Sequence, residues 1–284
     1  MAEELTAIIV ALLGGDALDR SVEAAASQAR RVIVVHRDGT IVDQHNKALG
    51  NAGRLDIPGK RKAAIALAAT EVVGLLEDTV LPGSDWSSAA VSACARKAVV
   101  ASAGPVEVAK SLPAASRSLA LSEYGAFNHP DLTTAPTVLP GCNMAFRRSA
   151  VLEAMQETDG LVDQVVFRNL LAAGGEFTWS PGMSVTFAHA NPAGARLATR
   201  FDHGRLYAST EAWNSGAAGR LIRAGKALLL PPVLFARGLQ NATAGDWKSP
   251  ATLGWLALQQ TAWAAGEFVG ATMGPSRKGM AQWQ

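Results

Sequence analysis

Two adjacent carboxylates, Glu77 and Asp78, are the side chains of this sequence best placed to do chemistry. They follow a short apolar run at residues 72–76 and precede a turn at Leu81-Pro82-Gly83. In α/β proteins, ligands bind in the crevice beyond the carboxyl ends of the sheet strands. The pattern therefore predicts a buried strand that delivers this acidic pair to a ligand site.

The elements that would position this pair alternate along the first two thirds of the chain. We expect strands at residues 7–13, 31–35, 72–76 and 98–103, a strand and turn at residues 178–188, and helices at residues 17–29, 60–70, 86–96, 149–155 and 162–173. The strand at residues 7–13 is apolar throughout, as strands of a parallel sheet are when both faces are covered. The alternation predicts an α/β fold whose mostly parallel sheet is flanked by helices in three layers.

Composition narrows the class of protein. The 284 residues are 49% hydrophobic and 18% charged, which argues against disorder. A net charge of +2 gives no reason to expect a nucleic-acid partner. Cys94 and Cys142 could form at most one disulfide, and their spacing indicates no metal site, which favours a reducing compartment. Glu3 and Glu4 stand where a signal peptide would be basic, so we expect a cytoplasmic protein.

The composition changes beyond residue 191, which predicts a domain at residues 1–190 and a helical region at residues 191–284. Before that change, residues 104–137 carry scattered Ser, Pro and Ala, which favours a loop-rich segment that could cover a cleft. After it, basic residues precede an apolar run at residues 228–236. These basic residues are Arg196, Arg200, Arg205, Arg220, Arg223 and Lys226.

The last apolar stretch, residues 251–274, is long enough to span a bilayer. Gln259, Gln260 and Glu267 argue against a span, because polar groups at the bilayer centre are costly. One helical stripe is apolar and consists of Trp255, Leu258, Ala262, Ala265 and Val269. An amphipathic helix fits better, and it could either pack against the rest of the protein or lie at a membrane surface.

Six segments between residues 7 and 189 follow one another in an order found in a known family. After the opening run come VIVVHRDGT (32–40), EVVGLLEDTVLP (71–82), GCNMAFRRS (141–149), VDQVVFRNLLAAGG (162–175) and TFAHA (186–190). Together they resemble the family 2 inverting glycosyltransferases of bacterial type, which have the GT-A fold. The resemblance implies that fold with a C-terminal helical extension.

The resemblance also implies roles on the donor side. Asp38 would contact the nucleoside, Glu77 and Asp78 would lie at the donor diphosphate, and Arg61 could reach that diphosphate. Asp78 and His189 would hold a divalent cation, Mg²⁺ or Mn²⁺, which balances the charge of the departing diphosphate.

On the acceptor side, the resemblance implies that Asp163 is the general base, which takes the proton of the attacking hydroxyl. Asn143 and Arg147 would line the acceptor site. The implied partners are a nucleotide-sugar donor, a lipid-linked or glycan acceptor and a membrane surface.

Three of the motifs depart from the family's pattern. Thr79 replaces the last carboxylate of the metal motif, and a hydroxyl is a poorer ligand for a divalent cation. His36 and Arg37 replace acidic residues of the donor turn, and Val162 replaces the glutamate before the base. These departures bear on activity more than on fold.

Each of these side chains also has a structural interpretation. Asp78 could cap a strand-end turn, Asp163 could be a helix N-cap, and Asp38 could belong to an Asp-Gly turn. His189 could be a hydrogen-bonded neighbour. Arg61 could be a solvated charge at the start of a helix, and Arg147 could be surface charge.

The leading hypothesis is a hexosyltransferase that moves a sugar with inversion onto a lipid-linked or polysaccharide acceptor, at the cytoplasmic face of the inner membrane. The alternative is a degenerate relative that binds a nucleotide-sugar or a partner without turnover. A nucleotidyltransferase is disfavoured, because Gly14-Gly15 is followed by Asp16 and not by a phosphate-binding lysine.

Overall fold

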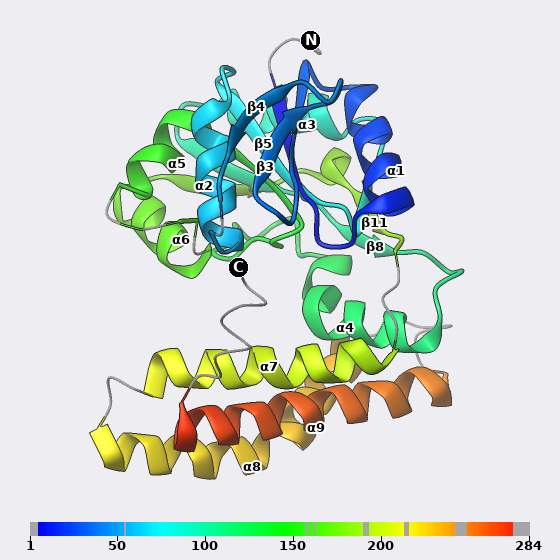
Figure 1. Cartoon of the computed structure of the whole chain (residues 1–284), viewed down its shortest axis with the longest axis vertical. Helices are drawn as coiled ribbons and strands as arrows, with labels where there is room; N and C mark the ends of the chain where they lie inside the picture. Colours follow the sequence, from blue (N-terminus) through cyan, green and yellow to red (C-terminus); the bar gives the residue numbers. More distant parts are fainter. Residues whose placement is uncertain are drawn as a thin grey trace. The chain divides into compact units, whose positions relative to one another are not determined.

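The computed structural model describes residues 5–53, 55–156, 158, 160–161, 163–189, 193–212, 216–241 and 249–274, without the side chains of 193–196 and 210–212. The chain forms two compact units (Figure 1). Unit 1 comprises Met1–Ala109 and Phe127–His189, and unit 2 comprises Lys110–Ala126 and Ala190–Gln284. The predicted division into a catalytic domain at residues 1–190 and a C-terminal helical region at residues 191–284 stays a prediction.

Unit 1 is built on an eight-stranded sheet in the order β10-β7-β9-β5-β1-β2-β3-β4. Its strands are β1 (Leu5–Val10), β2 (Arg31–Val35), β3 (Thr40–Asp43), β4 (Ala48–Asn51), β5 (Val72–Glu77), β7 (Val99–Ala103), β9 (Asn143–Arg147) and β10 (Glu176–Trp179). All of them run in one direction except β3 and β9, which are antiparallel to their neighbours. A second, three-stranded sheet has the order β6-β11-β8, with β6 (Val80–Pro82), β8 (Val106–Val108) and β11 (Val185–Phe187).

The central strands β1 and β5 are buried along their whole length. They pair in parallel, with Leu5 opposite Val72 and Val10 opposite Glu77. A continuous apolar run suits a strand covered on both faces. This pairing brings the ends of β1 and β5 to the same edge of the sheet, where Glu77 and Asp78 lie.

Helices cover this sheet. They are α1 (Gly15–Ala26), α2 (Ile57–Leu67), α3 (Trp86–Cys94), α5 (Arg148–Ala154) and α6 (Asp163–Ala172), with a 3₁₀ turn η2 at Pro181–Met183. Helix α2 begins with a regular N-cap, since the Asp56 carboxylate accepts a hydrogen bond from the Gly59 amide at 2.9 Å. Pro58 lies in the first turn of α2, where its missing N–H costs no hydrogen bond.

The predicted α/β class, with a large central sheet, flanking helices and a helical C-terminal region, is confirmed. Two local expectations differ from the structure. Residues 178–188, expected as a strand followed by a turn, contain the end of β10, then η2 and then β11, because Pro181 and Gly182 interrupt the pattern. Residues 104–137 include α4 (Ala114–Asn128), whose alanine and serine residues concealed its helical character.

Unit 2 contains α4, α7 (Ala193–Ala212), α8 (Gly216–Asn241) and α9 (Pro250–Met273), and the three long helices pack side by side (Figure 1). Among the described residues, no helix is both long and apolar enough to cross a membrane.

The polar residues of α9 face inward. Gln259, Gln260 and Glu267 are buried, while Leu258 of the predicted apolar stripe is exposed. The Gln259 side chain donates a hydrogen bond to the Ala115 carbonyl and accepts one from the Ser118 hydroxyl. The face of α9 that packs within unit 2 therefore combines these polar groups with Leu256 and small residues.

Most of the basic cluster described from the sequence is also internal to unit 2. Arg200 is buried and pairs with Glu123 at 3.0 Å. Arg205 donates to the Gly274 carbonyl at 2.9 Å, and Arg220 donates to the Ala271 carbonyl at 3.0 Å. Lys226 is exposed, and the side chain of Arg196 lies outside the described residues.

Candidate functional site

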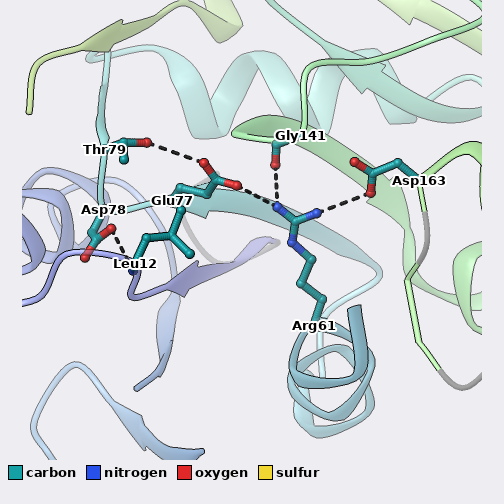
Figure 2. Close-up of polar contacts among 7 residues, drawn as sticks. All are labelled: Leu12, Arg61, Glu77, Asp78, Thr79, Gly141 and Asp163. Atoms are coloured by element: carbon teal, nitrogen blue, oxygen red, sulfur yellow. Dashed lines mark hydrogen bonds and ion pairs between the residues drawn. The ribbon is translucent and has the colours of Figure 1, made fainter. Parts of the chain in front are cut away.

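Three polar side chains and one backbone carbonyl meet at the C-terminal edge of β5 (Figure 2). Glu77 is the last residue of β5, and Asp163 is the first residue of α6. Arg61 comes from α2, and Gly141 precedes β9, which runs antiparallel to β5 with Asn143 opposite Leu76. The site therefore lies at the sheet edge where α/β proteins bind ligands.

Arg61 connects these elements. Its Nη2 donates to Glu77 Oε1 and to the Gly141 carbonyl, both at 2.9 Å, and its Nη1 donates to Asp163 Oδ1 at 3.2 Å. The Arg61 side chain is 7% exposed, so these ion pairs are largely shielded from water. A planar guanidinium suits this task, because its donors form a rigid fork.

Asp163 is the most accessible acid of this cluster, with its side chain 33% exposed. Its Oδ2 atom lies against Gly141, where an added Cβ would come within 3.1 Å of it. Desolvation raises the pKa of the Asp163 carboxyl above its ordinary value, and the Arg61 guanidinium opposes that rise. The Asp163 carboxylate is therefore a stronger base than usual, and Arg61 holds its Oδ1 atom.

Asp78 points away from this cluster and into the loop after β1. One oxygen accepts a hydrogen bond from the Leu12 amide at 2.9 Å. The other accepts from the Leu13 amide at 2.9 Å and the Gly14 amide at 2.7 Å. The side chain is fully buried. Asp78 thus holds the β1–α1 loop in place through charge-assisted hydrogen bonds.

The predicted metal ligands, Asp78 and His189, form no complete cation site among the described residues. Both oxygens of Asp78 are engaged by amides, and Glu77 accepts from Arg61 and, at 3.4 Å, from the Thr79 hydroxyl. His189 has a buried Nε2 atom without a hydrogen-bond partner among the described residues. Within that part of the chain, no group of three or more His, Cys, Asp or Glu side chains could hold a metal ion. A requirement for Mg²⁺ or Mn²⁺ stays a prediction.

Asp38 lies at the same sheet edge, in the turn between β2 and β3. Its carboxylate accepts a hydrogen bond from the Thr40 amide at 2.9 Å, and this bond lowers its pKa. Gly39 in this turn has a φ of 89°, which favours glycine. Lys60 donates to the Arg37 carbonyl at 2.9 Å, so α2 contacts this turn through the residue next to Arg61.

The Asn143 side chain lies in the core. Its oxygen accepts from Trp86 Nε1 at 2.8 Å, and its amide nitrogen donates to the carbonyls of Met183 at 2.7 Å and Gly104 at 3.1 Å. The residue is fully buried, so its polar atoms serve packing.

Arg147 lies opposite Val72, at the other end of β5 from Glu77. At about 3.3 Å per residue, these two ends of the strand are roughly 17 Å apart. Arg147 pairs with Glu71 at 2.5 Å and donates to the Cys94 carbonyl at 2.7 Å. The structure therefore gives no support to the acceptor role predicted for Asn143 and Arg147.

Sequence reasoning missed two contributors. The Gly141 carbonyl fixes the Arg61 guanidinium, and the amides of Leu12 to Gly14 receive the Asp78 carboxylate. Backbone groups carry no sequence signal of their own. The glycine pair at residues 14–15 was the one available hint of an unusual loop.

No family model matches the chain, and no curated protein sequence matches it. Among solved structures, it is similar to the mannosyltransferase PcManGT from Pyrobaculum calidifontis, in complex with GDP-Man and Mn²⁺. The sequence identity is 16%, the match covers 98% of this chain and 77% of that chain, and the TM-score is 0.47.

Glucosyl-3-phosphoglycerate synthase from Mycobacterium tuberculosis, in complex with Mn²⁺, UDP and glucosyl-3-phosphoglycerate, is also similar. Here the identity is 9%, the match covers 69% of this chain and 75% of that chain, and the TM-score is 0.43. At these identities and TM-scores, residue roles do not transfer from those proteins to this chain.

Proposed function

We propose that this chain is a GT-A glycosyltransferase that moves a hexose from a nucleotide-sugar to an acceptor hydroxyl with inversion, using Asp163 as the general base. The observation that carries this proposal is the bridge from Glu77 through Arg61 to Asp163, at the C-terminal edge of β5. Glu77 and Asp163, more than eighty residues apart in sequence, both form ion pairs there with the Arg61 guanidinium. The ordered motifs of the sequence independently assign both acids to a donor and acceptor site.

The proposed reaction is a single displacement. The acceptor oxygen forms a bond to the anomeric carbon as the bond from that carbon to the diphosphate oxygen breaks. The hydroxyl proton passes to Asp163, and the nucleoside diphosphate leaves with the electron pair. A divalent cation, if bound with the donor, would balance the charge of the diphosphate.

Asp163 suits the role of base for two reasons. Its Oδ1 atom is held by Arg61, so the orientation of the carboxylate is restricted before any substrate arrives. Desolvation raises its pKa, and a stronger base accepts a proton more readily in the transition state.

Arg61 is engaged by two carboxylates and a carbonyl. Its proposed contribution is therefore to position Asp163 and to balance the charge of Glu77, in preference to binding the donor diphosphate. Asp78 contributes by holding the loop at Leu12 to Gly14 beside the same sheet edge. Asp38 remains a proposed contact to the nucleoside.

The test begins with a donor screen. We expect one of UDP-, GDP- or dTDP-sugars, with Mn²⁺ present or absent, to raise the melting temperature, because a ligand that binds the folded state stabilises it. With that donor, Asp163→Asn should lower transfer or donor hydrolysis by about 100-fold or more while the donor still binds. Asp19→Asn, on the exposed part of α1, is the matched control and should keep full activity.

The binding-only alternative is favoured by one observation, the burial of Asp78 among backbone amides. A donor that stabilises the protein without any turnover, with lipid-linked and glycan acceptors supplied, would support it. Full transfer activity in Asp163→Asn would contradict the assigned base. A lipid-linked or polysaccharide acceptor and a cytoplasmic location remain part of the proposal.

A further inference from the structure

Helix α8 turns its apolar face to solvent. Five large side chains along it are between 44% and 71% exposed: Leu221, Ile222, Leu228, Leu229 and Val233. At 100° per residue these positions fall on one side of the helix, together with exposed Pro232 and Ala236. Globular proteins normally place such a stripe against their core.

The opposite face of α8 explains how the helix packs without these leucines. Its buried positions are small: Ala224, Ala227 and Gly238. A Cβ at Gly238 would come within 2.8 Å of Leu256 in α9, so the two helices approach closely there. Helix α8 thus packs through small residues and leaves these five large ones outside.

Helix α9 also has exposed apolar side chains, while its acidic residue is buried. Leu258, Phe268 and Met273 are exposed, whereas Gln259 and Glu267 are buried. Glu267 accepts a hydrogen bond from Trp263 Nε1 at 2.6 Å and pairs with Arg223 at 3.6 Å. The acidic group of α9 is therefore paired inside unit 2, with partners from α8 and from α9 itself.

The exposed charges on these two helices have one sign. Lys226 and Arg237 are exposed on α8, which contains no acidic residue. The one charged residue of α9 is the buried Glu267. An apolar face edged only by positive charge complements an anionic lipid surface, where apolar side chains enter the acyl boundary and basic ones meet the headgroups.

We infer that the outer face of α8 docks on an anionic lipid bilayer. The helix lies in the plane of the interface, since no described helix can span the membrane. Its 26 residues make a rod about 39 Å long at about 1.5 Å per residue, so a broad contact forms without insertion. This inference does not depend on the proposed transferase activity.

The experiment is co-sedimentation of the full chain with phosphatidylcholine vesicles, with and without 30% phosphatidylglycerol as roughly the anionic content of a cytoplasmic leaflet. We expect binding to the anionic vesicles that weakens as salt rises. The double variant Leu228→Glu and Leu229→Glu should lower the partition coefficient about tenfold or more, because it removes two apolar groups from the contact. Both positions are exposed, so folding should be unaffected.

The matched control places the same change on unit 1. Leu132→Glu with Val138→Glu replaces two exposed apolar side chains there and should leave vesicle binding unchanged. Lys226→Glu with Arg237→Glu should remove the preference for anionic over neutral vesicles. The inference is overturned if the wild-type chain stays in solution with anionic vesicles, or if the α8 double variant binds as well as the wild type. A concentration-dependent dimer that the α8 variant abolishes, without vesicle binding, would show instead that a second copy covers this face.

Discussion

At the scale of single residues, the pKa of Asp163 gives the proposed reaction a pH dependence. The base works when deprotonated, so activity should fall as the pH drops through the raised pKa of this carboxyl. Arg61 lowers that pKa, and its loss should raise it further. We therefore expect Arg61→Gln to move the acid limb of the kcat/KM profile to higher pH.

Arg61→Lys supplies the control for this prediction. It keeps the positive charge while losing the fork geometry, so its acid limb should lie closer to the wild-type position. A profile for Arg61→Gln that is lower at every pH but unshifted would mean that Arg61 acts only on structure.

The same carboxyl also affects stability. A pKa raised in the folded state means that the contribution of Asp163 to stability is complete below its ordinary pKa of about 4 and is lost as the pH rises through the raised value. Asp163→Asn removes this ionisation. Relative to the wild type, the free energy of unfolding of the variant should therefore increase between acid and neutral pH, as urea titrations at several pH values would show.

We expect the main role of the Asp78 carboxylate to be stabilisation of the fold, and not binding of a ligand. Asp78→Asn replaces one oxygen that accepts amide hydrogen bonds with a donor group, which leaves at least one buried amide unpaired. We expect a loss of about 2–4 kcal/mol in the free energy of unfolding without metal or donor present. Asp38→Asn, in an exposed turn, should change it by about 0.5 kcal/mol or less. An equally small change for Asp78→Asn would restore a ligand role for that carboxylate.

At the scale of elements, the contact of α3 with β5 limits the size of one residue. A Cβ at Gly74 in β5 would lie 2.3 Å from the Trp86 ring, which is fully buried and hydrogen-bonded to Asn143. Gly74→Ala should therefore destabilise the protein by about 1–3 kcal/mol through overpacking. Gly50→Ala, in the edge strand β4, meets its nearest neighbour at an ordinary 3.6 Å and should be close to neutral in thermal unfolding.

The thiol of Cys94 reports on the same packing. Desolvation raises its pKa to about 11, and both cysteines are buried. Since the thiolate is the reactive form, iodoacetamide at pH 8 should label Cys94 and Cys142 only when the protein opens. Mass spectrometry should show labelling rates that rise with urea, and fast labelling in the native protein would contradict the buried placement.

At the scale of the whole molecule, α9 holds unit 2 together through its polar side chains. Gln259 and Gln260 bond to α4, and Glu267 pairs with Arg223 of α8. A chain ending before Pro250 should lose more helical signal in circular dichroism than the 24 residues of α9 account for, because α4, α7 and α8 lose their partner. If the helical signal falls only by the amount that α9 contributes, the other helices are stable without it. For this reason, substitutions test the lipid contact more cleanly than truncation does.

Much of unit 1 could be predicted from local patterns. The strand at residues 31–35 and the helix that begins at Trp86 lie where their apolar periodicity indicated. Local sequence determines such elements, because burial on both faces of a strand requires a continuous apolar run. The antiparallel insertion of β9 between β5 and β7 was not predictable in this way, since strand order depends on contacts between distant segments.

The sequence by itself determined the α/β class, the sheet edge where Glu77 and Asp78 lie, and the acids that could do chemistry there. The direction of each side chain was decided only by the tertiary structure. Asp78 turned to the amides of Leu12 to Gly14, while Arg61 reached both Glu77 and Asp163. The face that α9 buries was settled in the same way. Its polar stripe faces inward because the hydrogen-bond partners of that stripe come from α4 and α8, which no pattern within α9 could reveal.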